Sequence, residues 1–308
     1  MLHFIVNPAA GTGNSLKKWQ LIEEELKRRG VVYRAHLTEG EGDAERLADT
    51  ITSESGESDI TLAVVGGDGT VSEVLTGIQS YSGVTLGYVP AGSGGDLART
   101  LGLSRSPLQA LDTILCRKSF IEMDVGRIET ESLVRNFAVS AGIGFDAAVC
   151  HEALHSSLKK KLNRVRLGKL TYGLIALRQL AKLKPSDAQI ILGDGKELRL
   201  KKMIFAAAMN GKYEGGGFRF SPEAENTDGY LDLCAAAGVS KPTILFLLPL
   251  ALFGKHTGFK YIKSLRAEKF KIITRLPCAV HADGESCGIS RNITIGLEPE
   301  KIRFIIDL

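Results

Sequence analysis

Five consecutive residues, Gly66-Gly67-Asp68-Gly69-Thr70, combine backbone freedom with a carboxylate and a hydroxyl. They follow the apolar run 60–65 and precede 71–78, where apolar residues recur at helical spacing, so they join a strand to a helix. The N–H groups of a helix start attract phosphate, and glycines let the backbone approach an anion closely. Asp68 adds a ligand for a divalent cation. A tight turn with a structural aspartate needs fewer glycines, so the pattern favours a phosphate site.

Two more loops rich in Gly, Pro and polar residues, 7–13 and 90–96, follow other predicted strands, and Thr38 ends a further one. The predicted strands are 2–6, 31–37, 60–65 and 84–89, and the predicted helices are 15–29, 42–53, 71–78 and 97–101. Alternating strands and helices with nearly continuous apolar strands predict an α/β domain whose parallel sheet is covered on both faces. Ligands bind at the carboxyl ends of such strands, so the loops should converge on one crevice.

The common nucleotide-binding fingerprints are absent from the sequence. No G-x-x-x-x-G-K-[ST] motif occurs, which excludes a P-loop. The run 92–97 has Leu97 where the dinucleotide fingerprint needs its last glycine. The phosphate site must therefore be of another type.

From about residue 120 the pattern changes to short alternating strands separated by turns. We expect a second domain, a mainly antiparallel β-sandwich, over 123–308, after a nucleotide-binding domain over 1–122. Its predicted strands are 120–129, 133–139, 188–192, 197–209, 230–236, 269–275, 279–282, 292–297 and 302–306. Helices are expected at 145–183 and 241–254. The segments 193–195 and 283–285 have the composition of hairpin turns.

Composition narrows the functional class. A net charge of +4 is mild and does not indicate a nucleic-acid partner. The five cysteines form no C-x-x-C pair, which argues against a disulfide framework or zinc site and fits a reducing cytoplasm. No signal peptide and no apolar run of about 20 residues is visible. We expect a cytoplasmic protein; the sequence leaves a homodimer open.

Several motifs along the whole chain together resemble the bacterial diacylglycerol kinase and lipid kinase family, which is related to sphingosine and ceramide kinases. They are Asn7-Pro8-x-x-Gly11, Gly66–Thr70 followed by Glu73-Val74, Pro90-x-Gly92-Ser93-x-x-Asp96-x-x-Arg99, the stretch from Asn210-Gly211 through Gly215-Gly216-Gly217 to Asp228-Gly229-x-Leu231-Asp232, and Asp283-Gly284-Glu285. The resemblance implies an ATP-binding first domain, a β-sandwich second domain and an active site between them. The chain departs from the family's usual residues at three positions, with Gly95 for Asn, Ser93 for Thr and Ser72 for Asn. Gly95 removes a polar side chain beside the phosphates, which would weaken or retune nucleotide binding.

The resemblance assigns roles to individual residues. Glu285, with Asp283, would be the general base, and Asp68 and Asp96 would organise Mg²⁺ and the phosphates. A structural Mg²⁺ would be held by Asp228, the carbonyl of Tyr230 and Glu225. The ATP contacts would be Asn7, Pro8, Gly11, Thr38, Gly66, Gly67, Asp68, Gly69, Thr70, Glu73, Gly92 and Ser93.

These residue types suit phosphoryl transfer, which needs positioning, charge neutralisation and a carboxylate near the acceptor oxygen. Oxygen ligands also suit Mg²⁺. Asp283-Gly284-Glu285 taken alone is a plain hairpin turn, and Asp228-Gly229 can likewise be only a turn before a strand. The other motifs favour catalysis for the first and leave the metal role of the second nearly balanced. His281 is assigned no role, since a lone strand histidine is usually packed or solvated.

A membrane contact is predicted from 156–184, where basic and apolar residues alternate without an acid. Such a segment is typical of an interfacial helix, although a solvated face of a core helix has a similar composition. The apolar run 244–253 is too short to span a membrane and contains a proline, so it is a core or groove helix that can line a lipid pocket.

The sequence thus predicts an ATP- and Mg²⁺-dependent lipid kinase at the inner face of the membrane that converts diacylglycerol to phosphatidic acid. One alternative is a soluble small-molecule kinase of the NAD kinase type, which has a similar Gly-Gly-Asp-Gly-Thr turn. The other is a non-catalytic homologue that binds nucleotide or lipid.

Overall fold

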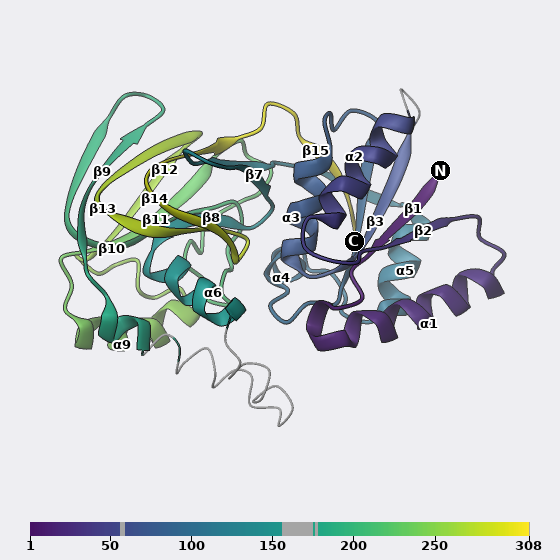
Figure 1. Ribbon diagram of the computed structural model, residues 1–308, viewed down its shortest axis with the longest axis horizontal. Helices are drawn as coiled ribbons and strands as arrows, with labels where there is room; N and C mark the ends of the chain where they lie inside the picture. Colours follow the sequence, from purple (N-terminus) through teal and green to yellow (C-terminus); the bar gives the residue numbers. More distant parts are fainter. Residues whose placement is uncertain (56–58, 156–174, 176–177, 308) are drawn as a thin grey trace.

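The computed structural model describes residues 1–308 except 56–58, 156–174, 176–177 and 308. Two lobes lie side by side along the long axis of the molecule, the α/β lobe with the N-terminus and a β-rich lobe (Figure 1). The chain passes from the first lobe to the second after residue 123 and returns at its C-terminal end. This confirms the predicted α/β domain with a parallel sheet and the predicted antiparallel sandwich.

The first sheet has the strand order β2-β1-β3-β4-β15-β5. The first five strands in this order are parallel neighbours, with a register that pairs Val6 with Leu37 and Val65, and Gly66 with Pro90. The glycine-rich loops after β1, β3 and β4 consequently leave the sheet at one edge, as predicted. The strands are β1 Leu2–Val6, β2 Arg34–Leu37, β3 Ile60–Gly66, β4 Val84–Pro90, β5 Ser119–Met123 and β15 Ile302–Ile306.

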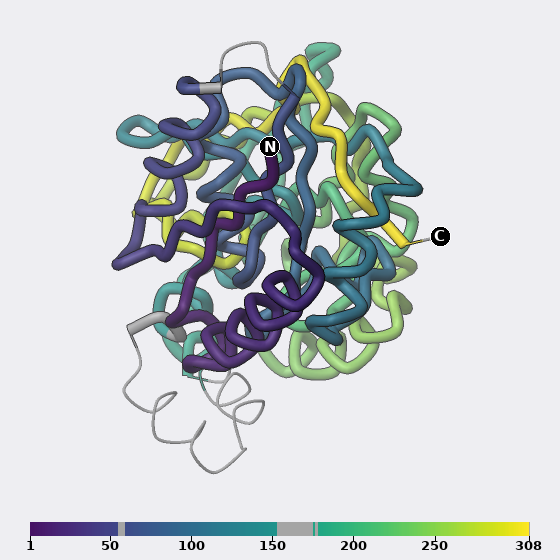
Figure 2. Tube along the Cα trace, turned by 90° about the vertical axis from the view of Figure 1, so that its right-hand side faces the viewer, coloured from purple at the N-terminus to yellow at the C-terminus, as the bar shows by residue number. Residues whose placement is uncertain are grey.

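The last strand, β15, lies in the first sheet, parallel to β4 and antiparallel to β5. Figure 2 shows this C-terminal segment, in yellow, running beside strands of the first lobe. The predicted boundary, with all of 123–308 in the sandwich, is therefore wrong at the C-terminus. Sequence pattern could not reveal this, because an apolar strand fits either sheet. A division of the rest of the chain near residue 122 remains a proposal.

Alternating side chains on the strands feed two cores, one on each face of the sheet. Ile5, Leu62 and Val64 pack with helices α2 and α3, while Phe4 and Val65 pack with α1 and α5 on the other face. This is the layered arrangement that a parallel sheet requires, since both faces must be covered. The helices of this lobe are the 3-10 turn Ala10–Gly13, α1 Asn14–Arg28, α2 Asp43–Ser55, α3 Asp68–Gly77, α4 Asp96–Thr100 and α5 Pro107–Cys116.

The second lobe is one sheet of nine strands folded over its own core. Two long strands, β10 and β13, allow the sheet to fold over. Each pairs with β9 at one end and with β8 at the other, and each has a register shift along its length. Bulges of this kind bend a strand so that it can serve two layers. The strands are β6 Gly126–Glu129, β7 Val134–Phe137, β8 Ser140–Gly144, β9 Ser186–Leu192, β10 Glu197–Met209, β11 Leu231–Ala237, β12 Ile262–Ala267, β13 Lys269–Ala282 and β14 Glu285–Leu297.

Several predicted elements of this lobe need correction. The predicted strand 120–129 is two strands in different sheets, and 269–275 and 279–282 are parts of the single strand β13. Strands β8 and β12 were not predicted. β8 is Ser-Ala-Gly-Ile-Gly and entirely buried, so it shows no alternation of apolar and polar residues.

Two helices flank the second sheet, α6 Phe145–His155 and α9 Lys241–Leu252. They agree with the predicted helices at 145–183 and 241–254, although most of the first range lies outside the described residues. No helix in the described part of the chain has the length and apolar composition needed to span a bilayer. The expected docking segment 156–184 also falls largely outside that part.

The position of β15 predicts that its core residue stabilises the first lobe. Phe304 is fully buried in the core shared with α2 and α3. Phe304→Ala should lower the free energy of unfolding by about 3–5 kcal/mol, measured by urea denaturation. Phe120→Ala on the neighbouring strand β5 is the control, since Phe120 is exposed and its loss should cost about 1 kcal/mol or less. Equal effects would show that β15 does not carry the core of this lobe.

Candidate active site

The glycine-rich loops meet at the edge of the first sheet through direct backbone contact. The N–H groups of Ala91 and Gly92 donate to the carbonyl of Gly66 at 2.7 and 3.0 Å. A Cβ added to Gly92 would lie 2.5 Å from the Cα of Gly67, and one added to Gly11, which has φ +60°, would clash with the carbonyl of Ala91. Only glycine permits this spacing. The loops after β1, β3 and β4 therefore form one continuous backbone surface.

Polar side chains predicted for nucleotide binding join this surface. The Asn7 amide donates from Nδ2 to Oγ1 of Thr70 at 3.2 Å, and its Oδ1 accepts from the N–H of Ala9. Thr38 is buried next to them, with its N–H on the carbonyl of Val6. Ser93 is exposed at the tip of its loop. The structure thus brings the first-lobe candidates together at the strand ends, while their contact with a nucleotide remains a prediction.

Asp68 and Asp96 lie close together in this surface. A Cβ built on Gly94 would lie 3.4 Å from Oδ2 of Asp68 and 3.6 Å from Oδ2 of Asp96. Asp68 accepts hydrogen bonds from the Tyr88 hydroxyl and the Asp96 N–H, at 3.2 and 2.9 Å. Burial raises the pKa of both carboxyls, and the charge of Asp68 adds to the shift at Asp96. Two close carboxylates, with Asp96 buried and Asp68 partly buried, are a site where a divalent cation would relieve mutual repulsion.

Asp96 also links the two lobes. Its Oδ1 pairs with Arg99, and its Oδ2 accepts the N–H of Gly216 at 2.7 Å, from the glycine run of the second lobe. The three glycines of that run, Gly215, Gly216 and Gly217, all have positive φ between +65° and +118°. Such a backbone directs its N–H groups toward an anion. The motif therefore holds the Asp96 carboxylate in place from the opposite lobe.

Gly95 lies in the left-handed region at φ +66°, at the start of α4. Asparagine tolerates this conformation, so the backbone does not explain the glycine. A Cβ at this position would lie 2.5 Å from a terminal nitrogen of Arg105, which donates to the carbonyl of Gly94 at 2.8 Å. The loop is also tied by Lys18, whose Nζ donates to the carbonyls of Pro90 and Arg105 at 2.6 and 2.7 Å. A guanidinium thus occupies the space that the glycine leaves.

Glu285 of the second lobe reaches the glycine-rich stretch 66–70 of the first. A Cβ added to Gly69 would lie 2.6 Å from Oε1 of Glu285 and 2.9 Å from its Cγ. Glu285 begins β14 directly after the turn at 283–284, which is the predicted hairpin. The acid therefore lies against the first turn of α3, where Asp68 is also located. Sequence separates these residues by more than two hundred positions, and the fold joins them.

Asp283 holds the turn that presents Glu285. Its carboxylate accepts three backbone N–H groups, from Ala138, Val139 and Ser140, at 2.8, 2.8 and 2.9 Å. Burial raises the pKa of Asp283 to about 7, against the effect of these three donors. Its own backbone has φ +47°. With three backbone donors, this carboxylate is suited to hold the turn in place. Of the two acids predicted to act as the base, Glu285 is therefore the one whose position suits that role.

Glu73, a predicted nucleotide contact, belongs to α3, and its side chain reaches the start of α2. Its Oε2 accepts the N–H of Ala44 at 3.2 Å, and Oε1 is 3.9 Å from Arg135. Burial raises the pKa of Glu73, and the charge of Glu285 adds to this. The carboxylate is thus used as a helix cap near the site.

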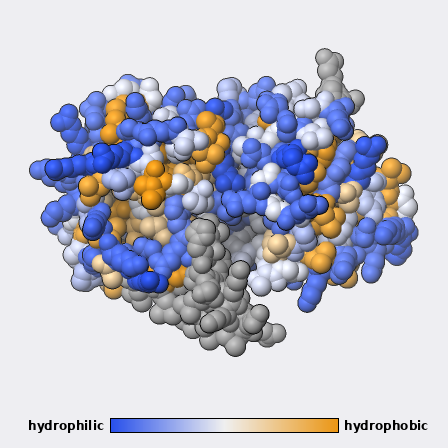
Figure 3. All heavy atoms as spheres, viewed as in Figure 1, coloured by the Kyte–Doolittle hydropathy of each residue, from blue (hydrophilic) through white to orange (hydrophobic). Residues whose placement is uncertain are grey.

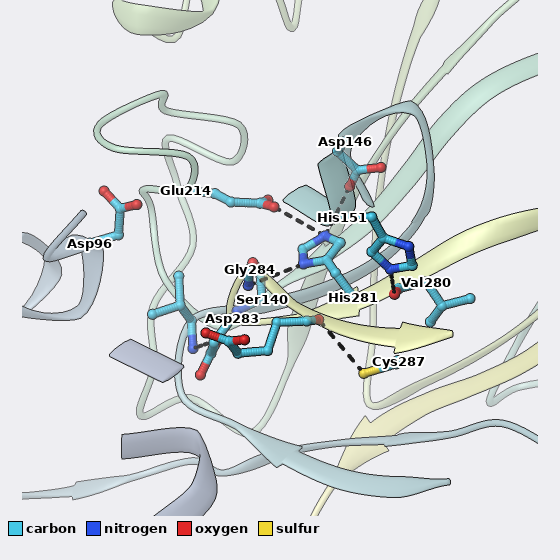
Figure 4. Close-up of polar contacts among 12 residues, drawn as sticks. Asp96, Ser140, Asp146, His151, Glu214, Val280, His281, Asp283, Gly284 and Cys287 are labelled. Atoms are coloured by element: carbon cyan, nitrogen blue, oxygen red, sulfur yellow. Dashed lines mark hydrogen bonds and ion pairs between the residues drawn. The ribbon is translucent and has the colours of Figure 1, made fainter. Parts of the chain in front are cut away.

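A buried cluster of Asp146, Glu214 and His281 lies behind the turn (Figure 4). Nε2 of His281 is 3.0 Å from Oδ2 of Asp146 and 3.2 Å from Oε1 of Glu214. Burial lowers the pKa of His281, but the Glu214 and Asp146 carboxylates raise it more, to about 9, while burial raises the pKa of Glu214 to about 7. Gly142 makes room, because its Cβ would lie 2.6 Å from Asp146.

Sequence reasoning missed this cluster, since it assigned His281 no role. In the described part of the chain, these three side chains have ligand atoms close enough together to hold a metal ion. The geometry of the cluster is also that of a histidinium between two carboxylates, which offsets one of the two negative charges. The ring also packs beneath the turn that carries Glu285, with Nδ1 3.4 Å from the backbone nitrogen of Gly284, although a charged histidine cannot accept a hydrogen bond there. No spacing signal connects these residues in the sequence.

The predicted structural Mg²⁺ ligands have another partner in this structure. Asp228 forms a salt bridge with Arg266 through Oδ2, and its Oδ1 accepts the N–H of Tyr230 at 3.0 Å. The Arg266 guanidinium also lies over the Tyr230 ring, 5.1 Å from its centre, and Glu225 is exposed. Binding of Mg²⁺ by Asp228 would require Arg266 to withdraw. The metal role of these residues stays a prediction.

Comparison with known proteins gives matches over nearly the whole chain. Residues 1–128 match the family described as diacylglycerol kinase catalytic domain, and 138–306 match the YegS C-terminal NAD kinase beta sandwich-like domain. A Bacillus subtilis protein, YtlR, whose name describes it as a candidate lipid kinase, is 32% identical, covering 92% of this chain and 93% of its own. A diacylglycerol kinase of Mycobacterium tuberculosis is 29% identical, covering 94% and 90%.

Among solved structures, a protein of Bacillus anthracis titled as a candidate diacylglycerol kinase superposes with a TM-score of 0.76. The match covers 99% of this chain and 97% of that protein at 23% identity. At this identity the likeness supports the two-lobed fold.

The buried cluster predicts a specific dependence of stability on pH. The pKa of His281 is raised from 6.5 to about 9. Its contribution to the free energy of unfolding is therefore complete below pH 6.5 and is lost as the pH rises through 9. The free energy of unfolding should fall by about 3 kcal/mol across this range, and His281→Gln should remove most of that fall. Urea denaturation at several pH values measures it.

His36→Gln in the first lobe is the control, because burial lowers the pKa of His36 and places its titration below this range. An unchanged pH slope in His281→Gln would contradict a charged histidine in the cluster.

Proposed function

The chain belongs to the lipid kinase family built from a diacylglycerol kinase catalytic domain and a YegS-type C-terminal domain, and from this we propose that it transfers the γ-phosphoryl group of ATP to the hydroxyl of a membrane lipid. The acceptor we propose is diacylglycerol, which would give phosphatidic acid. The relatives named as diacylglycerol kinases support this choice.

The observation that carries the proposal is the contact between Glu285 and Gly69. It brings a carboxylate of the second lobe to the helix start where a phosphate would bind, so close that a Cβ on Gly69 would lie 2.6 Å from Oε1. A hydroxyl lying beside Glu285 would face the bound phosphate and give up its proton to this acid. Asp283 and the His281 cluster would hold Glu285 in position.

The loops of the first lobe would bind the triphosphate. The backbone N–H groups at the start of α3, with the hydroxyls of Thr70 and Ser93, suit phosphate oxygens, and Asn7 supports Thr70. Asp68 and Asp96 would hold Mg²⁺, since their buried oxygens are the hard ligands that this ion prefers. When bound, Mg²⁺ would neutralise charge on the transferring phosphoryl group.

Arg105 would take part in this site. The Gly95 carried by this chain opens the space in which the guanidinium lies, close to Asp96 and the carbonyl of Gly94. A guanidinium binds phosphate oxygens with charge-assisted hydrogen bonds. Arg105 would thus replace the asparagine side chain that the resembled family usually has at position 95.

The substrate would be reached from the membrane surface. A diacylglycerol molecule stays in the bilayer, so the enzyme would work peripherally, at the inner face of the membrane. The predicted docking segment 156–184 lies mostly outside the described residues and remains a prediction.

The two other readings of the sequence make different predictions in one assay. A small-molecule kinase would phosphorylate NAD, and a non-catalytic homologue would transfer phosphate to no acceptor. Radiolabelled ATP offered with diacylglycerol, other lipid alcohols and NAD separates the three.

Replacement of the proposed base tests the mechanism. Glu285→Gln keeps the shape of the side chain but cannot accept the proton, so kcat should fall roughly 100- to 10,000-fold. The measurement is phosphate transfer to diacylglycerol in detergent micelles. Glu268→Gln, an exposed acid of the same lobe, is the matched control and should keep the wild-type rate. A Glu285→Gln enzyme with wild-type kcat would rule out the assigned base.

A set of three variants tests the role of Arg105. Arg105→Ala should weaken ATP binding about tenfold or more, because a hydrogen bond to a charged group is lost. Gly95→Asn should also weaken it, since the new Cβ displaces the guanidinium. In the Arg105→Ala background, however, Gly95→Asn should restore binding. Calorimetry with ATP gives these constants, with Arg291→Ala on β14 as the control; wild-type affinity in Arg105→Ala would contradict the role.

A further inference from the structure

Helix α9 and the turn after it expose an unusual number of large apolar side chains. Phe246 and Phe253 are 61% and 69% exposed. The full set, called here the α9 face, is Leu245, Phe246, Leu252, Phe253 and Phe259. Phe246 and Phe259 pack edge to face with their ring centres 6.3 Å apart, so the turn and the helix form one surface. Grouped apolar residues on a surface mark an interaction site.

The opposite side of the same helix is buried. Ile244, Leu247 and Ala251 enter the core beneath it, together with Phe205 and Phe220. After Lys241 the helix has no charged residue, so it is apolar on all sides. A soluble surface helix places polar residues outward instead. The outward residues of α9 are thus not explained by packing within the described part of the chain. On the face seen in Figure 3, by contrast, apolar residues are scattered among hydrophilic ones.

The charges around the α9 face have one sign. No acidic residue occurs from 233 to 267. The basic residues in this stretch are Lys241, Lys255, Lys260, Lys263 and Arg266. Lys255 and Lys260 flank the exposed phenylalanines and are themselves exposed, while Arg266 is paired with Asp228. Aromatic and apolar residues with lysines and no acid are the composition of a surface that enters the headgroup region of anionic lipids.

The α9 face is mechanically connected to the candidate active site. The N–H of Arg219 donates to the carbonyl of Ala251 at 2.8 Å, and a Cβ on Gly254 would lie 2.6 Å from Pro222. The segment 213–222 that makes these contacts also carries Gly216, which holds Asp96. Segment 213–222 therefore contacts α9 and also contacts Asp96 of the candidate active site. A partner bound to α9 would lie next to this segment.

We propose that the α9 face docks on an anionic lipid bilayer, with Phe246 and Phe253 entering the interface and Lys255 and Lys260 on the lipid headgroups. The proposal rests on the function proposed above in that a membrane lipid is the substrate, but the binding itself can be measured without catalysis. It assigns a docking role to described residues that the sequence alone indicated only as a core or groove helix.

Vesicle sedimentation of the full-length protein tests this surface. The vesicles contain phosphatidylcholine with phosphatidylglycerol, or phosphatidylcholine alone. Phe246→Ser with Phe253→Ser should lower partitioning onto the anionic vesicles about tenfold or more, since two aromatic side chains that would enter the lipid interface are lost. Lys255→Glu with Lys260→Glu should lower it on anionic vesicles and leave the weak binding to phosphatidylcholine unchanged.

The matched control is Val32→Ser with Ile289→Ser, two apolar residues elsewhere that are 78% and 71% exposed. This variant should sediment like wild type. Circular dichroism confirms that each variant is folded, and the lysine pair still decides if the phenylalanine pair does not fold. Wild-type sedimentation in both α9 variants would overturn the proposal. A second result would also overturn it. If sedimentation equilibrium shows that the wild type is a dimer and the phenylalanine variant a monomer, the α9 face binds a second copy of the chain.

Activity separates this proposal from the proposed function. The phenylalanine variant should phosphorylate lipid in detergent micelles at the wild-type rate and lose most of its rate on vesicles. If wild type phosphorylates no lipid, the proposed function fails, while sedimentation still decides the docking surface. Equal loss on micelles and vesicles would show that α9 acts on the active site and not on docking.

Discussion

The close approach of Glu285 to Gly69 is the constraint on which the site depends. An acid from one lobe can reach the helix start of the other only because Gly69 has no side chain in the way. The same lack of Cβ atoms at Gly92 and Gly11 lets three loops pack backbone to backbone at the end of the sheet. The site is thus defined by where side chains are absent as much as by the carboxylates, and any larger residue at these positions would separate the groups that phosphoryl transfer needs together.

Maintaining this contact requires buried charge, which is unfavourable unless it is paired. Three backbone N–H groups hold the Asp283 carboxylate, an N–H from the other lobe holds Asp96, and His281 lies between two acids. Each of these arrangements fixes a turn or a loop that belongs to the site. These contacts hold the turn that carries Glu285, and in the proposed mechanism they would preorganise this acid for catalysis.

The two lobes are joined by more than a linker. Strand β15 returns to the first sheet between β4 and β5, and Lys301 just before it pairs with Asp124 at 2.9 Å, on the other crossing between the lobes. Two chain crossings, the Gly216–Asp96 contact and the Glu285–Gly69 contact restrict how far the lobes can separate. The outer surface formed by α9 contacts the segment that makes one of these contacts, so the proposed docking surface and the candidate active site share a structural element.

Local pattern was sufficient to predict the α/β lobe and the three glycine loops at one sheet edge, with Asp68 in one of them, because strands, turns and helix starts are encoded in short stretches. Asp96 and Glu285 were singled out by the family resemblance, and their roles stay predictions. Local pattern was not sufficient for β8, which is too small and too buried to alternate, or for β15, whose partners are far away in the chain. The histidine cluster, the clamp on Asp283 and the guanidinium beside Gly95 likewise depend on residues brought together only by folding. The order of residues supplies the chemical groups, whereas folding selects which of them meet, because contacts between distant segments leave no periodic signal in the chain.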